Sequence, residues 1–212
     1  VEAVSKFSID LGVAVPTGKD SLSMTMKYED GDEVRAPGTV IITAAAETSD
    51  RDRIITPDLK TADRLSLKLQ PTSSLPAEAS AKADQLLYLN LSGQSDNPLG
   101  GSAYAQTLAK VGASVPTVVD PKAFKEGFNL VQQLIKEDKI LAGHDVSSGG
   151  LITAISEMCF AGDVGVSLKI EKDDLGAFLF TEKPGVVLQV ADADLAYVQD
   201  KLSAFELSLI HI

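Results

Sequence analysis

Two loops combine residue types that could bind a phosphate group together with a divalent cation. In the first, residues 16–21, Gly18 lets a ligand approach the backbone, Lys19 supplies a positive charge, Asp20 can ligate a metal and Ser21 offers a hydroxyl. This set suits phosphate with Mg²⁺. It is not a P-loop, because the first glycine of that pattern is missing and a strand is predicted to follow. Taken alone, the same residues are more simply explained by an ordinary glycine turn with solvated charges.

The second loop, residues 144–150, leads into a predicted helix. Ser147 or Ser148 could cap that helix, and its free N–H groups and dipole would attract an anion. Asp145 could bind Mg²⁺ on that phosphate, since without a metal the carboxylate would repel it. The alternative is a side-chain cap followed by a tight Gly-Gly turn.

Other candidates are weaker. Cys159 follows Met158 within a predicted helix and is expected to be a core thiol rather than a nucleophile. His144 could act as a base or make a structural hydrogen bond. Residues 97–101 are predicted to form a loop and helix entry, with a phosphate role as the alternative. The acidic residues Glu171, Asp173 and Asp174 are predicted to lie on a solvent-exposed face of the protein.

Composition excludes several classes of protein. The chain has 212 residues, with 30 Asp and Glu against 19 Lys and Arg, and a net charge of −11. The acidic balance argues against nucleic-acid binding, and no apolar run approaches the roughly 20 residues of a membrane span. The single cysteine excludes an intramolecular disulfide and a multi-cysteine metal site. The expected compartment is therefore the reducing cytoplasm.

The elements that position the first loop are predicted from periodicity. Apolar residues from Val4 to Leu11 recur at helical spacing. Residues 21–28 alternate as a half-buried strand, Asp30-Gly31 signals a hairpin, and 40–46 would supply a strand that pairs back.

A second domain follows a proline-containing connection. We predict an N-terminal domain over 1–56, a linker over 57–85 with a short strand at 65–69, and a domain over 86–206. Mixed helices and strands predict an α+β or α/β layered fold with a mixed sheet. The expected strands are 86–91, 164–170, 178–180 and 186–190, with a brief extended segment at 140–142. The expected helices are 102–111, one opened by Pro121, one starting at 151, and 193–204.

The two ends of the chain are unusual. The sequence starts at Val1, almost directly in a helical pattern, so we expect a preceding portion. One codon reading of residues 207–212 matches a transposon-end adapter used in sequencing libraries. We therefore expect these residues to be a scar, with a short terminal strand as the alternative.

Four ordered segments resemble the phosphoribosylformylglycinamidine synthase family. They are Val15-Pro-Thr-Gly-Lys-Asp-Ser-Leu-Ser-Met24, Leu99-Gly-Gly-Ser-Ala-Tyr-Ala-Gln106, the stretch from His144 to Gly162, and Leu179-Phe-Thr-Glu-Lys-Pro-Gly-Val-Val-Leu-Gln-Val190. The resemblance covers most of residues 1–206. Ser148 departs from the family pattern, which usually has Asp there, and the connection over 56–85 is expanded.

The resemblance implies a fold and an activity. Family members use ATP, glutamine and Mg²⁺ to convert formylglycinamide ribonucleotide to the amidine. ATP activates the formamide oxygen as an iminophosphate, and ammonia from a separate glutaminase domain displaces the phosphate. The synthetase region contains two copies of an N-domain and C-domain pair related to aminoimidazole ribonucleotide (AIR) synthetase. This chain is similar to the end of the second N-domain followed by much of the C-domain, so its partners would be the missing parts of the polypeptide.

The resemblance also implies roles for individual residues. Gly18 and Ser21 match a loop that contacts ATP and substrate, whereas Lys19 replaces an Asn that helps to bind Mg²⁺ and could contact phosphate directly. Asp145 and Ser147 match ligands of Mg²⁺ and nucleotide (ATP or ADP) at an auxiliary site. The catalytic His and the glutaminase Cys of the family lie outside this chain. Alternatives are another member of the superfamily, such as AIR synthetase or selenophosphate synthetase, and a non-catalytic nucleotide-binding module.

Overall fold

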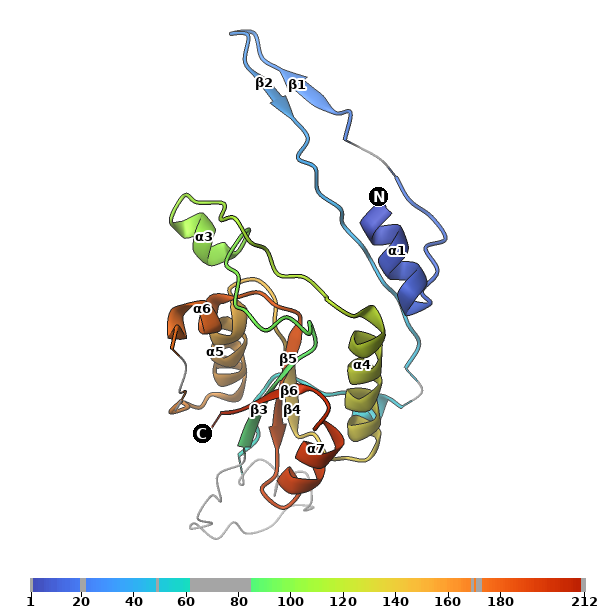
Figure 1. Ribbon diagram of the computed structural model, residues 1–212, viewed down its shortest axis with the longest axis vertical. Coiled ribbons are helices and arrows are strands. Elements are labelled where there is room, and N and C mark those ends of the chain that lie inside the picture. Colours follow the sequence, from blue (N-terminus) through green and yellow to red (C-terminus); the bar gives the residue numbers. More distant parts are fainter. Residues whose placement is uncertain are drawn as a thin grey trace. The chain divides into compact units, whose positions relative to one another are not determined.

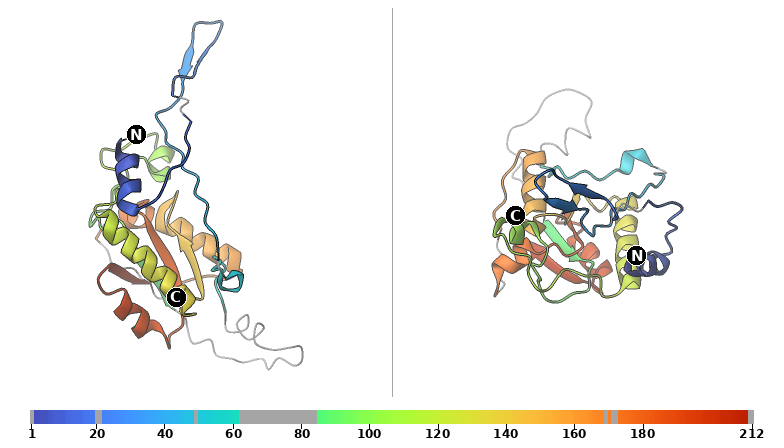
Figure 2. Two further views of the ribbon diagram at one scale, coloured as in Figure 1. Left: turned by 90° about the vertical axis from the view of Figure 1, so that its right-hand side faces the viewer. Right: turned by 90° about the horizontal axis from the view of Figure 1, so that it is seen from above.

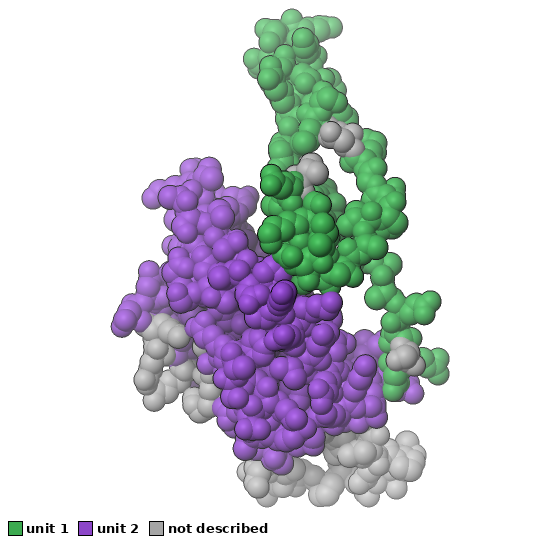
Figure 3. Space-filling model, turned by 45° about the vertical axis from the view of Figure 1, so that its right-hand side comes forward, with its two compact units in different colours: residues 1–51 green, residues 52–212 purple. Residues whose placement is uncertain are grey.

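The chain divides into two units, Val1–Arg51 and Asp52–Ile212, which Figure 3 distinguishes by colour and which are described separately below. The computed structural model describes residues 2–19, 22–48, 50–61, 85–168, 170 and 173–210. The boundary between the units falls a few residues before the expected end of the first domain at 56.

The described part of unit 1 contains one helix and one hairpin, joined by irregular segments (Figure 1). Helix α1 (Glu2–Leu11) and an antiparallel hairpin of β1 (Thr25–Lys27) and β2 (Glu33–Arg35) confirm the predicted helix and turn. None of the described residues of this unit is buried, so the expectation of a half-buried strand is wrong. Residues 40–46 form no strand either, and the strand that pairs with β1 is β2.

Unit 2 contains a four-stranded sheet in the order β4-β5-β3-β6. Its strands are β3 (Gln85–Asn90), β4 (Ala142–Asp145), β5 (Gly185–Val190) and β6 (Glu206–Ile210). Every strand pairing in the described part of this sheet is antiparallel. The prediction of a mixed sheet is therefore wrong. The two central strands lie where the sequence predicts them.

Helices cover both faces of this sheet (Figures 1 and 2), which confirms the layered α+β fold. On one face, α5 (Gly150–Gly162) and α6 (Leu175–Phe180) pack on Leu86 and Tyr88 of β3. On the other face, α4 (Pro121–Lys136) and α7 (Leu195–Lys201) pack on the β3 side chains that point the opposite way, Leu87 and Leu89. This alternation along one buried strand is the reason that two cores form.

The start of α4 follows directly from the sequence. The Asp120 carboxylate accepts the N–H groups of Lys122 and Ala123 at 2.8 and 3.2 Å, and Pro121 occupies the first helical turn. Both features are standard helix-start signals, and the predicted opening of this helix at Pro121 is confirmed.

Three predicted elements differ from the structure. Residues 178–180 belong to α6 rather than to a strand, because Asp174 caps a helix that buries Phe178 in the core. Residues 164–168 and 170 form no strand and pack on the α5 core as an irregular segment. Helix α3 (Ala103–Thr107) is shorter than expected and ends just before Ala109, whose φ is 52°. The predicted strand at 65–69 lies outside the described residues.

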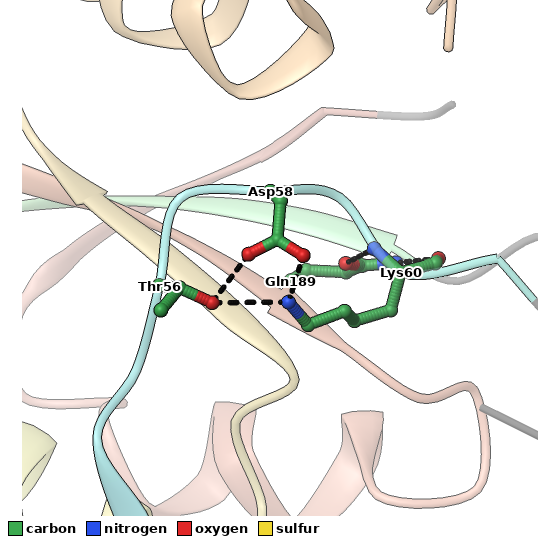
Figure 4. A network of polar contacts seen from close by, with 4 residues as sticks. All are labelled: Thr56, Asp58, Lys60 and Gln189. Carbon is green, nitrogen blue, oxygen red and sulfur yellow. Dashed lines mark hydrogen bonds and ion pairs between the residues drawn. The ribbon is translucent and has the colours of Figure 1, made fainter. Parts of the chain in front are cut away.

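A short segment, residues 54–60, crosses the sheet edge at β4; we call it the strap. The Thr56 carbonyl accepts the N–H of Gly143 at 3.1 Å, and Leu59 is buried against the α5 core. The buried Gln189 side chain accepts the Lys60 N–H at 2.8 Å and donates to the Lys60 carbonyl at 2.7 Å (Figure 4). Part of the expected linker is thus fixed to unit 2.

Strand β6 pairs with the outer edge of β3, with Leu207 opposite Leu89. The backbone of residues 206–210 therefore adopts the terminal strand that was the alternative for this segment. The origin of residues 207–212 as a scar stays a prediction.

Candidate functional site

Three of the four motif segments meet at one end of the unit 2 sheet. The link is formed by residues 180–183, which run from the last residue of α6 toward β5, and each of them contacts a residue of the segment 94–104. Phe180 stacks on Tyr104 with ring centroids 4.6 Å apart, and the Thr181 hydroxyl donates to the Pro98 carbonyl at 2.8 Å. The Lys183 ammonium donates to the Gln94 carbonyl at 2.9 Å.

Glu182 is the residue of this link that contacts both loops. Its Oε1 accepts the N–H of Ala103 at 2.7 Å, at the start of α3, and the N–H of Gly149 at 2.8 Å, at the start of α5. One carboxylate oxygen therefore joins residues 99–103 to residues 144–150.

The loop from β4 to α5 carries the candidate metal and nucleotide ligands. The Val146 N–H donates to the Gly185 carbonyl at 2.8 Å, and its side chain is buried. Asp145 and Ser147, on either side of it, are exposed. The structure therefore presents both predicted ligands to solvent within one short loop.

Two consecutive glycines make the turn into α5 possible. Gly149 and Gly150 have φ of 88° and 75°, a region that other residues adopt at a cost. A Cβ on Gly150 would also lie 2.7 Å from the Leu179 carbonyl oxygen. The tight Gly-Gly turn expected as part of the alternative interpretation is present, and the phosphate and metal role of the loop stays a prediction.

The predicted capping of α5 by a serine is wrong. The cap position is Gly149, which has no side chain, and the anion at this helix start is the Glu182 carboxylate. The Ser147 carbonyl instead accepts the Gly150 N–H at 3.0 Å, which closes the turn.

His144 contacts protein groups through both ring nitrogens. Nδ1 lies 2.7 Å from the Asp145 carbonyl oxygen, and Nε2 lies 3.2 Å from Oε2 of Glu157 on α5. Since both nitrogens are engaged and the side chain is mostly buried, this geometry favours the structural role over that of a base.

Cys159 packs beside the α5 core, as expected for a core thiol. Burial raises the pKa of its thiol, which disfavours the thiolate that a nucleophile requires.

The loop over residues 97–102 is held by its own hydrogen bonds. The Ser102 hydroxyl donates to the Leu99 carbonyl at 2.6 Å and accepts the Ala105 N–H at 3.1 Å, which caps α3. An open, mostly apolar pocket of about 230 Å³ lies beside the loop. It is lined by Leu99, Gly100, Tyr104, Ala105, Leu108, Lys110, Gly112, Ala113 and Ser114.

The other candidate loop belongs to unit 1. Gly18 has open space around it, and Lys19 is exposed. Asp20 and Ser21 lie outside the described residues. Asp145 and Ser147 belong to the other unit, so the roles of Gly18, Lys19 and Ser21 stay predictions.

Two further properties concern the whole described region. No group of three or more His, Cys, Asp or Glu side chains is arranged to hold a metal ion within the described ranges. No helix in the same part of the chain is long and apolar enough to cross a membrane.

Sequence reasoning assigned no role to Glu182 or Lys183. The available signal was two adjacent charged residues between apolar segments, followed by Pro184-Gly185. Lys183 is only 1% exposed, an unusual position for a lysine, and this burial cannot be read from the sequence.

Comparisons with known proteins agree with this arrangement. The family model "AIR synthase related protein, C-terminal domain" matches residues 82–212, and "FGAR-AT PurM_N-like domain" matches residues 1–47. A relative from Arabidopsis thaliana, "Probable phosphoribosylformylglycinamidine synthase, chloroplastic/mitochondrial", is 36% identical over 97% of this chain. Relatives called "Phosphoribosylformylglycinamidine synthase" from Homo sapiens and Schizosaccharomyces pombe are 39% and 37% identical over 93% and 98% of the chain.

The chain spans only 13% of the length of the Arabidopsis and human relatives and 15% of the S. pombe one. Among solved structures, "T. maritima PurL complexed with ATP" matches 99% of this chain and 30% of its own, with a TM-score of 0.56 and 12% identity. "T. maritima PurL complexed with FGAR" matches 99% of this chain and 32% of its own, with a TM-score of 0.53 and 11% identity. These two structures support the fold.

Proposed function

The chain belongs to the family of AIR synthase related proteins, and we propose that it supplies part of the synthetase region of a phosphoribosylformylglycinamidine synthase. The observation that carries the proposal is identity of 36–39% to three such synthases over 93–98% of this chain. The convergence of three motif segments at Glu182 supports it, because these are the segments that carry the family resemblance.

The proposed reaction is an ATP-dependent C–N bond formation. The formamide oxygen of formylglycinamide ribonucleotide takes the γ-phosphoryl group of ATP, which gives an iminophosphate and ADP. Ammonia released from glutamine by a separate glutaminase domain then replaces the phosphate. This chain would contribute binding residues, while other parts of the polypeptide contribute the catalytic His and the glutaminase Cys. The proposed compartment is the cytoplasm, although the name of the plant relative places that protein in organelles.

Within this scheme, Asp145 and Ser147 would hold an ATP or ADP molecule and its Mg²⁺. Mg²⁺ in proteins is commonly held by one or two carboxylates together with phosphate oxygens and water, rather than by a cage of side chains. A single carboxylate that is 76% exposed, on a loop with an exposed serine, fits that mode. The bound cation would supply positive charge against the phosphates.

The loop in unit 1 would bind ATP and substrate. Gly18 would allow close approach to its backbone, Lys19 would contact phosphate, and Ser21 would donate a hydrogen bond. Support for these roles comes from the family resemblance of residues 15–24 and from the match of residues 1–47 to the N-terminal domain model.

The nucleotide site can be tested by calorimetry with Mg-ADP on the whole chain and on Asp145→Asn. Loss of a charged metal ligand should weaken binding about tenfold or more. Asp200→Asn is the matched control, because Asp200 is exposed on α7 and has no part in the site. Equal affinities for wild type and Asp145→Asn would reject the metal-ligand role.

The full activity can be tested in a chimera. This chain would replace the matching 200 residues of the human relative, and formation of formylglycinamidine ribonucleotide would be assayed. In that chimera, Ser21→Ala should lower the synthetase rate about tenfold and leave the glutaminase rate unchanged. A chimera that binds Mg-ADP but forms no product would favour a non-catalytic nucleotide-binding module.

A further inference from the structure

We propose that Glu182 is a positioning residue for the nucleotide site. One oxygen of its carboxylate would hold the loop over residues 97–103 and the loop over residues 144–150 in fixed positions relative to each other. This inference rests on the proposed function, because the loop that Glu182 fixes carries Asp145 and Ser147, the proposed metal and nucleotide ligands. Its physical basis is the pair of hydrogen bonds from Ala103 and Gly149, at 2.7 and 2.8 Å.

The position of Glu182 is itself strongly determined. Its chain neighbours Thr181 and Lys183, and Phe180 before them, each contact the segment 94–104 by stacking or hydrogen bonding. Thr181 and Lys183 are buried, so the backbone on both sides of Glu182 is fixed within the core. A side chain that extends from such an anchored segment can hold a neighbouring loop with little loss of conformational entropy.

A carboxylate is well suited to this task. Hydrogen bonds from backbone N–H groups to an ionised acceptor are about twice as strong as neutral ones. A negative charge at the start of α5 also complements the positive end of the helix dipole.

The same contact determines how a phosphate could bind. Because Glu182 occupies the Gly149 N–H, that group is not available to a phosphate oxygen, and the local charge is negative. A nucleotide at this loop would therefore depend on a cation at Asp145. We expect the site to bind Mg-ADP and to bind ADP poorly without the metal.

Three substitutions of Glu182 separate the effect of its side-chain length from the effect of its negative charge. Glu182→Gln keeps an acceptor oxygen at the same distance but removes the charge, whereas Glu182→Asp keeps the charge and is one methylene too short to reach both N–H groups. Glu182→Ala removes both properties. A positioning role predicts that Gln is tolerated better than Asp, and a purely electrostatic role predicts the reverse order. Glu126→Gln, on the exposed side of α4, is the matched control.

Two measurements on the whole chain test the proposal. Amide hydrogen exchange should accelerate about tenfold at both Ala103 and Gly149 in Glu182→Ala and Glu182→Asp, and less than about threefold in Glu182→Gln, which keeps both hydrogen bonds but loses the charge. The Kd for Mg-ADP should rise about tenfold in the same two variants and less than about threefold in Gln. Urea unfolding of each variant separates these local effects from a loss of folding, and if Ala does not fold, the comparison of Gln with Asp decides.

The outcomes distinguish this proposal from the proposed function. Unchanged exchange at both amides in Glu182→Asp overturns the link between the loops. Released amides with an unchanged Kd overturn the positioning of the nucleotide site. If the wild-type chain binds no Mg-ADP, the proposed nucleotide site fails and with it the positioning role, even where exchange confirms the link between the loops.

Discussion

Both units of the chain have amphipathic sequence patterns, but only unit 2 uses them to bury side chains. In unit 1, helix α1 and the hairpin leave large apolar residues exposed, including Ile9, Met24 and Ile41 at 74%, 63% and 87%. In unit 2, helices on both faces of one sheet bury two separate clusters, with Leu87, Leu89 and other residues fully inaccessible. Periodicity therefore identifies an element and its apolar side, while burial depends on a partner that faces that side.

The comparison also concerns the candidate site. The β4–α5 loop of unit 2 is fixed by backbone hydrogen bonds, by Glu182 and by two glycines in a tight turn. The loop at residues 16–19 of unit 1 lies in a unit with no buried described residue. We expect the β4–α5 loop to be ordered in this chain by itself. We expect the loop at residues 16–19 to be more mobile, with weaker protection of its amides against hydrogen exchange.

The largest difference between the units should be seen in core truncation. Leu134 on α4 is 1% exposed, so Leu134→Ala should lower the free energy of unfolding by about 2–5 kcal/mol, through lost burial and the cavity that remains. Ile41→Ala in unit 1 should change it by less than about 0.5 kcal/mol, because Ile41 is 87% exposed. Urea unfolding followed by circular dichroism measures both, and similar losses in the two variants would contradict the comparison.

The same contrast explains which elements could be predicted. Leu86–Leu91, the helix at Pro121 and the α5 helix were predictable because their patterns are long and each faces a partner within the chain. Phe178–Phe180 has strand-like residues, but the Asp174 cap and the burial of Phe178 decide for a helix. Residues 40–46 have the composition of a strand and no partner strand in the described structure.

The loop that carries the candidate ligands could be predicted from the sequence, but the contact with Glu182 that holds this loop could not. The residue types and order in 144–150 point to Asp145 and Ser147, and the structure presents both on one exposed loop. Glu182 comes from a segment more than thirty positions away, and its contact with Gly149 depends on how α6 and β5 pack. No local pattern contains that information, so the cap was assigned to a nearby serine.

A substitution that detaches the strap, at the start of unit 2, should have an effect of intermediate size on stability. Gln189→Leu removes both hydrogen bonds to the Lys60 backbone and leaves a part-buried N–H and carbonyl without that partner. We expect a loss of about 1–3 kcal/mol in the free energy of unfolding. Gln133→Leu on the exposed side of α4, where Gln133 donates to Glu137, should cost less than about 0.5 kcal/mol. Equal losses would show that the two Gln189 hydrogen bonds to the strap contribute no more than one exposed side-chain hydrogen bond.

The smallest expected effect is a pH dependence within the strap. Burial raises the pKa of the Asp58 carboxyl, but hydrogen bonds from Lys60 and Thr56 and the charge of Lys60 lower it more, so the pKa lies below its ordinary value of 3.8. A carboxyl whose pKa is lower in the folded state stabilises the fold above its unfolded pKa, and loses this contribution as the pH falls through the folded pKa. The stabilisation should therefore be complete above about pH 5 and decline below about pH 4.

Asp58→Asn isolates this contribution from the other carboxyls of the chain. At about pH 6 the variant should be less stable than wild type by about 0.2–1 kcal/mol, as for a partly exposed ion pair, and the two curves should converge as the pH falls below 4. Lys60→Met should reduce the same difference, because the ammonium is the main stabilising partner. Glu33→Gln in unit 1, which removes an exposed pair with Arg35, should leave urea unfolding of unit 2 unchanged over the same pH range. Parallel curves for wild type and Asp58→Asn would show that the Asp58 carboxyl is equally stabilised in the unfolded chain, and the strap would then owe its attachment to the contacts of Gln189, Leu59 and the Thr56 carbonyl.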